Sequence, residues 1–561
     1  MKIKRAQAPL NTLFVGFQDQ DNLGLRYLMA AAGAAGHKTA IETFSDDPQA
    51  LVRRVQAEKP DFIGFSLIFQ FMTAKFARVI DALRKAGVTA HIAVGGHYPS
   101  FDAKEVLGVI TSADSVIRFE GEATMLDLLE RLGTGGAWQE TPGLTARLND
   151  GGIRENALRK QIMDLDTLPW PDRRDIPYET SDRPTAAILG SRGCPWNCDF
   201  CSIRPFYEAQ EGSLRRLRSP ADVVEEMRHL FHDRGVALFL FQDDDFLATG
   251  ARARNWAGEV ADGIAESDIG GRVAWKMSCR SDELRPDIIA RMQRGGLTHV
   301  YMGVESGDEQ GLKNMNKMMK PDKHIAAGNM LRQAGLSFDF GFMLLDPWSD
   351  LRMVRANVDF LDDFVGDGWS VAGFCRMLPY AGTPVARKLV AEGRLEGTAF
   401  EPDYRFLDPT LDRFYAWMLE TFHTRNFTGR GLANLLRGMI FESRLQSPHT
   451  RWMTQAETDW LQFMTARANR SATMTLRQAL DYFERTPLEE VTVHTGFLEG
   501  LTRRELTEQG QITEQLDRFW TAPERQARRR ATHRRAAPAG GFDKSWTFAE
   551  TDFETRGVGV R

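Results

Sequence analysis

The sequence predicts an α/β protein in which two parallel-sheet domains precede a mainly helical region. Residues 12–131 alternate short apolar runs with amphipathic stretches of about 10–15 residues, the pattern of strands and helices in parallel sheets. The same alternation resumes after residue 184 and gives way to helical periodicity beyond residue 396. At 561 residues, the chain is also too long for a single hydrophobic core.

The composition is that of an ordinary soluble protein. Hydrophobic residues make up 42% and charged residues 26% of the chain, and the formal net charge is -5. We therefore expect no nucleic-acid partner, because such partners select a basic surface. No apolar run approaches the length needed to span a bilayer, so we expect no membrane span and a cytoplasmic location.

Residues 1–145 predict a complete doubly wound domain of the Rossmann or flavodoxin type. Its expected strands are the apolar runs TLFVGF, KTAIETF, DFIGFS, HIAVGG and DSVIRF. Ligands of such sheets bind outside the carboxyl ends of the strands. The functional edge is therefore expected in the loops at residues 18–22, 66–72, 95–100 and 120–122.

The remaining chain is expected to form a linker, a barrel, a helical domain and a tail. Residues 146–183 contain TLPWPDRRDIPYETSDRP, whose prolines and charges predict a linker. Residues 184–395 provide about six strand and helix pairs, which predict a partial (β/α)6 TIM barrel rather than a closed one. Residues 396–520 are expected to cover the substrate, and residues 521–561 to form a basic, flexible tail, with an anion contact as the alternative.

Three of the five cysteines stand close together in the run GCPWNCDFC. Gly193 and Pro195 disfavour a helix, so Cys194, Cys198 and Cys201 are expected in a loop. Three thiolates bind three irons of a cubane cluster and leave the fourth iron without a protein ligand. The alternatives are a structural zinc completed by a distant histidine or by Cys279, and a ferredoxin, although both usually have four protein ligands.

The run CPWNCDFC resembles the C-x3-C-x2-C signature of the radical S-adenosylmethionine (SAM) superfamily, with the aromatic Phe200 before its last cysteine. The resemblance implies that Cys194, Cys198 and Cys201 hold a [4Fe-4S] cluster whose open iron binds SAM. In that family an electron from the cluster cleaves SAM, and the resulting 5'-deoxyadenosyl radical takes hydrogen from an unactivated carbon. An external electron donor such as flavodoxin or ferredoxin is implied as a partner.

Two further segments stand where that family contacts the amino acid part of SAM. FQDDDF is expected to end the second barrel strand, and one of Asp243 and Asp244 resembles the acid that accepts a hydrogen bond from the SAM ammonium. A strand-end turn or a helix N-cap is the alternative for these acids. Arg280 in WKMSCRSD stands where related enzymes hold the SAM carboxylate with a guanidinium.

Two more segments match the contacts with the nucleoside part of SAM. YMGVESGDE resembles the G-V-E-S segment after the fourth strand, which implies a role for Glu305 on the ribose hydroxyls. MLPYAGTP resembles the P-x-x-G-T turn after the sixth strand, so Pro379 and Tyr380 are expected beside the adenine.

The domain before the cysteines resembles the cobalamin-binding domain of class B radical SAM enzymes. The matching runs DNLGLRYLMAAAGAAGH, DFIGFS, VGGHYPS and RFEGEAT stand in the order of that family. The resemblance implies cobalamin contacts at Gln18, Ser66, Gly95, Gly96, His97, Gly121 and Glu122. Glycines there let the backbone approach the corrin or its nucleotide tail, although a flavodoxin-like turn uses glycines too.

Cobalt is expected to have no histidine ligand. Domains that bind cobalt through histidine carry D-x-H-x-x-G after the first strand, whereas this chain has FQDQDNLG. The resemblance therefore implies histidine-off cobalamin. His97 is the nearest alternative ligand, but its loop follows the fourth strand, and a contact with the cobalamin tail is the expected role.

Together the resemblances predict a cobalamin-dependent radical SAM C-methyltransferase. The predicted reaction transfers a methyl group from methylcobalamin to an unactivated carbon of a small, natural-product-like molecule, after the 5'-deoxyadenosyl radical has removed a hydrogen. The first alternative is an oxidative cyclase or rearrangement enzyme with the same cofactors, and the second is a non-catalytic iron-sulfur electron carrier. A methylthiotransferase is excluded, because it needs three further cysteines in the front domain and residues 1–193 contain none.

Overall fold

The computed structural model describes residues 1–18, 21–176, 184–248, 250–445, 451–490 and 496–536. The chain divides into two compact units. Unit 1 comprises Met1–Pro177, Ala186–Glu226 and Leu378–Asp403, and unit 2 comprises Tyr178–Thr185, Met227–Met377 and Tyr404–Arg561. Three elements contain residues of both units, and they are β8 (Thr185–Ile188), α8 (Pro220–Arg234) and β17 (Pro402–Tyr404).

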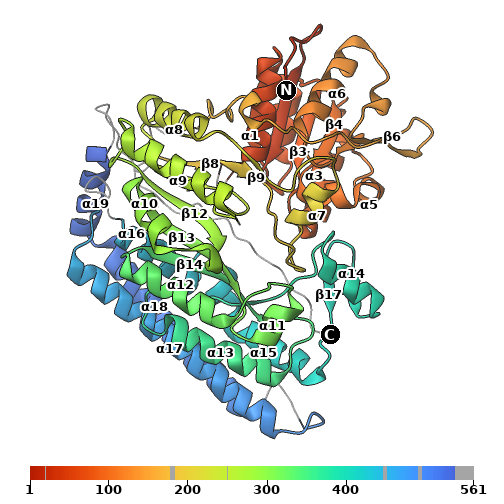
Figure 1. Cartoon of the computed structure of the whole chain (residues 1–561). Helices are drawn as coiled ribbons and strands as arrows, with labels where there is room; N and C mark the ends of the chain where they lie inside the picture. The colour runs from red at the N-terminus through yellow and green to blue at the C-terminus, as the bar shows by residue number, and fades with distance from the viewer. Residues whose placement is uncertain (19–20, 177–183, 249, 446–450, 491–495, 537–561) are drawn as a thin grey trace. The chain divides into compact units, whose positions relative to one another are not determined.

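The centre of unit 1 is a sheet of seven strands in the order β2-β1-β3-β4-β5-β6-β7 (Figure 1). The first five strands are parallel, whereas β6 and β7 pair antiparallel at one edge. The strand order reverses at β1, as in the doubly wound fold that the sequence predicts. The strands are β1 (Asn11–Gly16), β2 (Lys38–Thr43), β3 (Phe62–Ser66), β4 (His91–Gly95), β5 (Ser115–Ile117), β6 (Leu144–Arg147) and β7 (Ile153–Glu155).

Helices cover both faces of this sheet, which explains why its central strands are apolar throughout. Phe14 and Ile117 pack with residues of α1 and α6, whereas Val15 and Ile63 pack with residues of α2, α3 and α5. The helices are α1 (Leu23–Ala34), α2 (Gln49–Glu58), α3 (Thr73–Lys85), α4 (His97–Phe101), α5 (Ala103–Val109) and α6 (Glu122–Thr134).

The sheet extends beyond residue 145, where the sequence predicts a linker. Residues 153–155 form β7 and pair with β6 through the register Ala146↔Arg154. The strand is only three residues long and mostly exposed, so the sequence has no alternation of apolar and polar residues that would predict it. From residue 156 to residue 176 the described chain has no strand and contains a short 3-10 helix, Leu165–Thr167, and residues 177–183 lie outside the described residues.

The rest of unit 1 consists of short elements around the cysteines and near residue 390. β9 and β10 form a two-stranded antiparallel ribbon in which Arg192 pairs with Arg216. The elements are β9 (Ser191–Arg192), α7 (Ile203–Glu208), β10 (Arg216–Leu217), α14 (Pro384–Ala391) and β16 (Leu395–Gly397).

Unit 2 contains a curled parallel sheet with strands in the order β15-β14-β13-β12-β11. Together with β8, which precedes them in the chain, these strands begin the six strand and helix repeats that the sequence predicts. The strands are β11 (Leu238–Phe241), β12 (Ala274–Arg280), β13 (Leu297–Glu305), β14 (Ser337–Leu345) and β15 (Cys375–Arg376). The helices between them are α9 (Ala251–Glu266), α10 (Pro286–Arg294), α11 (Glu309–Asn314), α12 (Pro321–Gln333) and α13 (Leu351–Val365).

The two faces of this second sheet differ in chemistry. On β14, Phe338, Phe340 and Phe342 point to the outer face, where they contact aromatic residues of α13. Asp339 and Gly341, which alternate with them, lie on the opposite face, called the inner face below. The sheet therefore has an apolar face under helices and a polar face on the inside of its curl.

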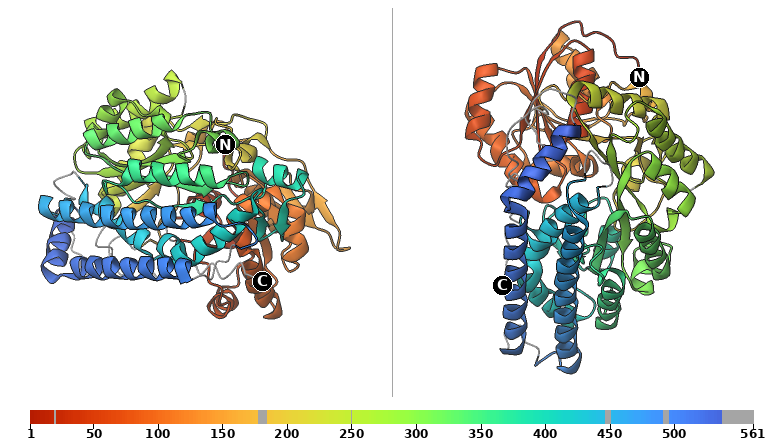
Figure 2. Two further views of the ribbon diagram at one scale, coloured as in Figure 1. Left: turned by 90° about the horizontal axis from the view of Figure 1, so that it is seen from below. Right: turned by 90° about the vertical axis from the view of Figure 1, so that its left-hand side faces the viewer.

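The helical region after residue 404 contacts the inner face of this sheet and the helix α13 that covers its outer face. α16 contacts β14, and α17 packs along α13 and α18, which Figure 2 shows as long helices lying side by side. The helices are α15 (Pro409–Phe427), α16 (Leu432–Ser443), α17 (Gln455–Arg485), α18 (Gly496–Thr521) and α19 (Pro523–Ala536). α19 is the described part of the expected tail, and residues 537–561 lie outside the described residues. Across the described chain, no helix combines the length and the apolar character that crossing a bilayer requires.

Candidate functional site

The three clustered cysteines lie in a loop of unit 1 directly after β9, as the sequence predicts. The loop has neither helix nor strand, and the Cys201 amide donates to the Cys198 carbonyl across 3.1 Å. All three cysteines, including Cys194, are partly exposed. Gly193 has a φ of +91°, and a Cβ there would lie 2.0 Å from the Leu214 carbonyl oxygen. Only glycine fits this backbone, so Gly193 sets the direction in which the loop leaves β9.

Side chains on both sides of Cys198 fasten the loop. The Asp199 carbonyl accepts a hydrogen bond of 3.0 Å from the Val385 amide, and the Asp199 carboxylate forms an ion pair with Lys388 of α14. The Arg204 guanidinium donates to the Pro195 carbonyl across 2.9 Å. Lys388 was not predicted, because nothing in its local pattern places it beside a loop that lies far earlier in the chain.

Two buried acids and two buried arginines hold the β9-β10 ribbon that leads into the loop. Glu120 accepts hydrogen bonds from Arg216 (2.7 and 2.9 Å) and Arg192 (3.1 Å), and Glu122 accepts one from Arg192 (2.7 Å). Burial alone would raise the pKa of Glu120, but the hydrogen bonds from Arg216 and the charge of Arg192 lower it. Glu120 therefore stays ionised and ties the loop after β5 to the ribbon.

The residues predicted to contact cobalamin gather at the carboxyl ends of the unit 1 strands. They are Gln18 after β1, Ser66 at the end of β3, Gly95, Gly96 and His97 at the end of β4, and Gly121 and Glu122 after β5. Gly96 has a φ of +115°, and a Cβ there would lie 2.5 Å from the Leu67 carbonyl oxygen, so only glycine brings these two loops together. The side-chain oxygen Oε1 of Gln18 accepts a hydrogen bond of 3.1 Å from Arg26, which gives that side chain a packing role as well.

His97 links the loop after β4 to the cysteine loop within unit 1. Its Nε2 lies 2.6 Å from the Ser202 hydroxyl, directly after Cys201, and its ring stacks on Phe206 with 4.8 Å between centroids. Burial lowers the pKa of His97 to about 4, so the imidazole is neutral near pH 7. The sequence predicts a contact with the cobalamin tail for His97, but it did not reveal the contact with Ser202.

The residues predicted to bind SAM in unit 2 follow successive strands of its sheet. Asp243 and Asp244 follow β11, Arg280 ends β12 and Glu305 ends β13. Asp243 is 3% exposed, whereas Asp244 is exposed to solvent. The next residue, Asp245, accepts a hydrogen bond of 3.1 Å from the backbone amide three residues on and closes the strand-end turn. Asp245 therefore contributes to a strand-end turn of the kind that the sequence left as an alternative for these acids.

Arg280 and Glu305 both have partners that the sequence did not reveal. The Arg280 guanidinium donates to both oxygens of Asp282 (3.0 and 3.1 Å) and to the Lys317 carbonyl (2.8 Å). The Lys317 ammonium lies 3.3 Å from Glu305, whose φ of +71° is rare for a residue with a side chain. Such strain is typical of ligand sites. A carboxylate bound at Arg280 would share its N–H groups with Asp282.

The turn predicted to line the adenine, with Pro379 and Tyr380, belongs to unit 1. Tyr380 is 37% exposed, and its carbonyl accepts a hydrogen bond of 2.6 Å from Thr383, the N-cap of α14. Gln70, in the loop after β3, accepts from the Ala381 amide across 2.8 Å and donates to the Ala399 carbonyl across 3.2 Å. Gln70 therefore attaches this segment to the first sheet, and no local sequence signal marks it.

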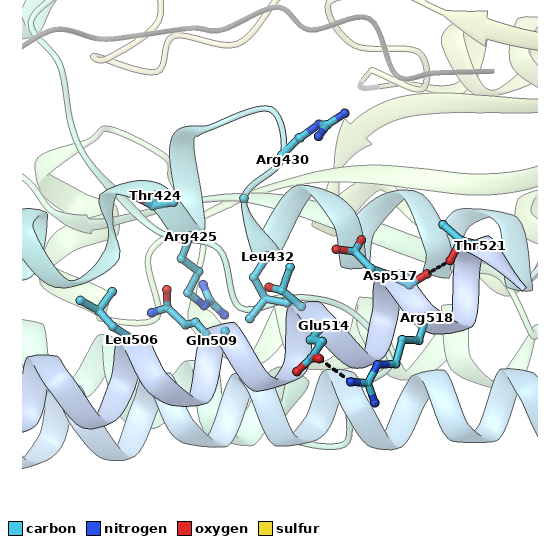
Figure 3. Close-up of a pocket in the computed structure, with 13 residues that line it drawn as sticks. Thr424, Arg425, Arg430, Leu432, Leu506, Gln509, Glu514, Asp517, Arg518 and Thr521 are labelled. Atoms are coloured by element: carbon cyan, nitrogen blue, oxygen red, sulfur yellow. Dashed lines mark hydrogen bonds and ion pairs between the residues drawn. The ribbon is translucent and has the colours of Figure 1, made fainter.

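A cavity of about 600 Å³ lies in the helical region, lined by residues of α15, α16 and α18 (Figure 3). Arg425 in its wall is 1% exposed, donates to the Ala372 carbonyl across 2.8 Å, and has its pKa lowered to about 10 by burial. Figure 3 shows Glu514 and Arg518 paired with each other on α18. None of the predicted site residues lines this cavity.

Two family models match the chain in the regions just described. Residues 15–129 match the B12 binding domain, and residues 188–356 match the radical SAM superfamily. The first range runs from the end of β1 to most of α6, and the second contains the three clustered cysteines and the ends of β11 to β13. The chain belongs to the cobalamin-binding radical SAM enzymes.

Relatives of this radical SAM enzyme include a methylase and a cyclase. The chain is 29% identical over 343 residues to the hopanoid C-3 methylase of Methylococcus capsulatus, covering 59% of this chain and 62% of the relative. It is 25% identical over 301 residues to the anaerobic magnesium-protoporphyrin IX monomethyl ester cyclase of Rubrivivax gelatinosus, covering 52% of each. A solved structure, that of the cobalamin-dependent SAM radical enzyme OxsB with aqua-cobalamin and SAM bound, has the same fold at 17% identity and a TM-score of 0.68, over 94% of this chain and 83% of OxsB.

A cobalamin-binding radical SAM enzyme uses a [4Fe-4S] cluster, SAM and cobalamin. The residues fit the cluster, because Cys194, Cys198 and Cys201 share one fastened loop and each thiolate of a cubane binds a different iron. In the described part of the chain, no three His, Cys, Asp or Glu residues, these cysteines included, are placed to hold one metal ion between them, whereas a cubane distributes three thiolates over three irons. Burial raises the pKa of the thiols of Cys279 and Cys375, the latter to about 12, so both remain protonated.

Proposed function

We propose that this radical SAM enzyme is a C-methyltransferase that transfers a methyl group from cobalamin to an unactivated carbon of a small, natural-product-like molecule. The observation that carries the proposal is the combination of a B12 binding domain with a three-cysteine loop in one chain. The relative named hopanoid C-3 methylase supports methyl transfer to carbon. When bound, the cluster and SAM supply the 5'-deoxyadenosyl radical, and cobalamin supplies the methyl group.

The chain's own residues hold these groups. Cys194, Cys198 and Cys201 bind three irons as thiolates, and the fastening of their loop limits its movement during electron transfer. Because a cysteine thiol must lose its proton to bind iron, loading the protein with the cluster releases protons. The electron comes from an external donor such as flavodoxin or ferredoxin.

The SAM contacts follow from charge and hydrogen bonding. Asp243 or Asp244 accepts from the ammonium, and Arg280 donates to the carboxylate. Glu305 accepts from the ribose hydroxyls, and the Lys317 ammonium lies 3.3 Å from its carboxylate. The remaining contacts in the proposal are Phe200 beside the cluster and Pro379 with Tyr380 at the adenine.

The cobalamin contacts in the proposal are the strand-end residues of unit 1. Ser66, Gly95, Gly96 and Gly121 leave backbone accessible at the edge where ligands of doubly wound sheets bind. No histidine stands in the loop after β1, so cobalt is bound without a protein imidazole from this loop. Gln18, His97 and Glu122 contribute polar side chains at the same edge.

A labelled-methyl experiment tests the proposal. Full-length protein is purified anaerobically, reconstituted with iron, sulfide and cobalamin, and incubated with dithionite, methyl-labelled SAM and candidate small molecules. A C-methyltransferase forms both 5'-deoxyadenosine and S-adenosylhomocysteine, and the label appears in the product. Failure to cleave SAM would instead favour an iron-sulfur electron carrier.

The second candidate is an oxidative cyclase or rearrangement enzyme, which the relative named magnesium-protoporphyrin IX monomethyl ester cyclase favours. In that case 5'-deoxyadenosine forms, while S-adenosylhomocysteine and labelled product do not. The same incubation therefore separates the two candidates, and the Cys198→Ala variant provides the background for SAM cleavage.

A further inference from the structure

The inner face of the unit 2 sheet carries a cluster of polar side chains that the proposed cofactor contacts do not use. The inner-face cluster consists of Lys276 on β12, Tyr301 on β13, Asp339 on β14 and Arg437 on α16. Tyr301 stands opposite Asp339 in the strand register, and Arg437 Nε lies 2.8 Å from Asp339 Oδ2. The cluster therefore joins three neighbouring strands to the helix that packs on their inner face.

The cluster contains more positive than negative charge. Asp339 is paired with Arg437, and Glu305, the next acid along the same face, is paired with Lys317. Lys276 is half-buried, and among the described residues it has neither a hydrogen bond nor an ion pair. Burial lowers the pKa of Lys276, and the charge of Asp339 only partly offsets that shift. Within the cluster, the Asp339 carboxylate is therefore the one negative charge beside the two positive charges of Lys276 and Arg437.

The other groups that face Lys276 do not balance its charge. His299 stands beside it in the register with its Nδ1 2.9 Å from the Ser337 hydroxyl, and burial lowers the pKa of His299 to about 3, so it is neutral. The thiol of Cys375 is protonated, as is the hydroxyl of Tyr301, whose pKa burial raises. An unpaired half-buried ammonium costs stability, so a protein retains one where a ligand supplies the counter-charge.

The cluster is open to a ligand. Tyr301 is 40% exposed although it stands at the centre of a nine-residue strand flanked by two others. The Tyr301 hydroxyl lies over Gly341, where a Cβ would come within 2.8 Å of it. A larger residue at position 341 would fill the space beside the hydroxyl, so glycine keeps this part of the face clear.

We propose that Lys276, with Tyr301 and Arg437, binds an anionic group of the substrate, a carboxylate or a phosphate. The ammonium and the guanidinium supply charge, and the phenol donates a hydrogen bond to the anion. Asp339 orients Arg437 and limits the site to a small excess of positive charge. The inference that the bound molecule is the substrate rests on the proposed function, whereas anion binding by these residues does not.

Two small anions serve as probes of the full-length, cofactor-loaded protein without reductant. Trifluoroacetate, followed by fluorine NMR, represents a carboxylate, and inorganic phosphate, followed by phosphorus NMR, represents a phosphate. The Lys276→Met variant is expected to bind the preferred probe at least about ten-fold more weakly than the wild type, a loss of about 1.4 kcal/mol. Lys323→Met, which removes an exposed lysine from α12, is the matched control and should bind like the wild type.

A stability measurement separates ligand binding from a structural role. Lys276→Met removes a half-buried charge and keeps a side chain of similar length, so the Tm without added anion should rise. A structural lysine would instead give a lower Tm on substitution. Unchanged binding in Lys276→Met, equal weakening in Lys323→Met, or no binding of either probe to the wild type overturns the inference.

The two proposals fail separately. If the protein cleaves SAM and transfers methyl groups but Lys276→Met binds both probes normally, only the anion site is wrong. If the probes bind through Lys276 but SAM is never cleaved, the proposed function is wrong and the anion site remains. Whether phosphate or trifluoroacetate responds identifies the anionic group.

Discussion

The cysteine loop of unit 1 and the inner face of unit 2 treat buried charge in opposite ways. In unit 1, Glu120 receives three hydrogen bonds from two arginines that are at most 10% exposed, and its pKa is lowered. In unit 2, Lys276 on the inner face has no described hydrogen-bond or ion-pair partner, and burial lowers its pKa. The first arrangement stabilises one conformation, whereas the second leaves charge for something else to neutralise.

The pairing of charges distinguishes the region that supports the cysteine loop from the inner face, where we propose that an anion binds. A loop that holds a metal cluster gains from neighbours that cannot move, so its surrounding charges are paired within the chain. A surface that binds a charged molecule must keep some polar groups unsatisfied until that molecule arrives. The comparison can be tested by removing charges from each region and measuring loading, stability and their dependence on pH.

Removing a loop cysteine should have the largest effect. Cys198→Ala leaves one iron of the cluster without its thiolate, so iron per chain and 5'-deoxyadenosine formation should both fall to background. Iron and sulfide analysis after anaerobic reconstitution measures the first, and product chromatography measures the second.

Cys375→Ala is the control for this substitution. The Cys375 thiol is half-buried and protonated, and it donates a hydrogen bond of 3.5 Å to the Phe342 carbonyl. The Cys375→Ala variant should therefore bind as much iron per chain as the wild type. Iron lost equally in both variants would mean that the loop does not hold the cluster.

Breaking the paired charges of unit 1 should cost the most stability. Glu120→Gln leaves Arg192 and Arg216 buried with weaker partners, and the free energy of unfolding should fall by about 3–5 kcal/mol. Urea unfolding at pH 7 measures the change. Glu211→Gln breaks the exposed pair with Lys160, whose side chains are 74% and 71% exposed, and should cost less than about 1 kcal/mol. If both substitutions lowered the free energy of unfolding equally, burial would make no difference to what these ion pairs contribute.

Asp346 should give a pH dependence of stability with the sign expected for a raised pKa. The folded-state pKa of about 6 lies above the ordinary value of 3.8, so ionisation opposes folding. The free energy of unfolding should fall as pH rises from about 4 to about 6, by at most about 3 kcal/mol from this group. Asp346→Asn keeps an acceptor for the Trp348 amide at 2.8 Å and removes the charge.

The measurement is urea unfolding of the wild type and Asp346→Asn at pH 4 and at pH 7. The variant should be more stable than the wild type at pH 7 and lose that advantage at pH 4. A variant that is less stable at both pH values would show that the carboxylate is needed for its hydrogen bonds rather than tolerated.

The smallest expected effect concerns His97, for which two roles compete. If His97 mainly positions the cysteine loop through Ser202, His97→Phe should retain stacking on Phe206 but weaken iron retention by about ten-fold or more, as loss of a supporting contact around metal ligands does. Ser202→Ala should behave alike. Cobalamin affinity, measured from the corrin absorbance on titration, should stay within about two-fold of the wild type.

The opposite result identifies the other role. Iron retention like the wild type together with weaker cobalamin binding would assign His97 to the cobalamin tail, as the sequence predicts. Either result decides whether the loop after β4 belongs with the paired scaffold of unit 1 or with its ligand edge.

Much of this protein was readable from its sequence, because the relevant signals are local. Apolar runs and amphipathic spacing predicted the two parallel sheets and the helical region, and the C-x3-C-x2-C spacing predicted a loop that could hold a cluster. The resemblance to radical SAM enzymes implied that Asp243, Arg280 and Glu305 stand at strand ends, and that is where they lie.

Only the tertiary structure decided which distant side chains meet. Four contacts could not be predicted from the local sequence around either partner. They are Glu120 with Arg216, Lys388 with Asp199, His97 with Ser202, and Lys317 with Glu305. The unpaired state of Lys276 is equally invisible in a sequence, since it depends on every side chain packed around the inner face. Spacing along a chain records backbone geometry, whereas pairing and burial of charge arise only when separate elements pack together.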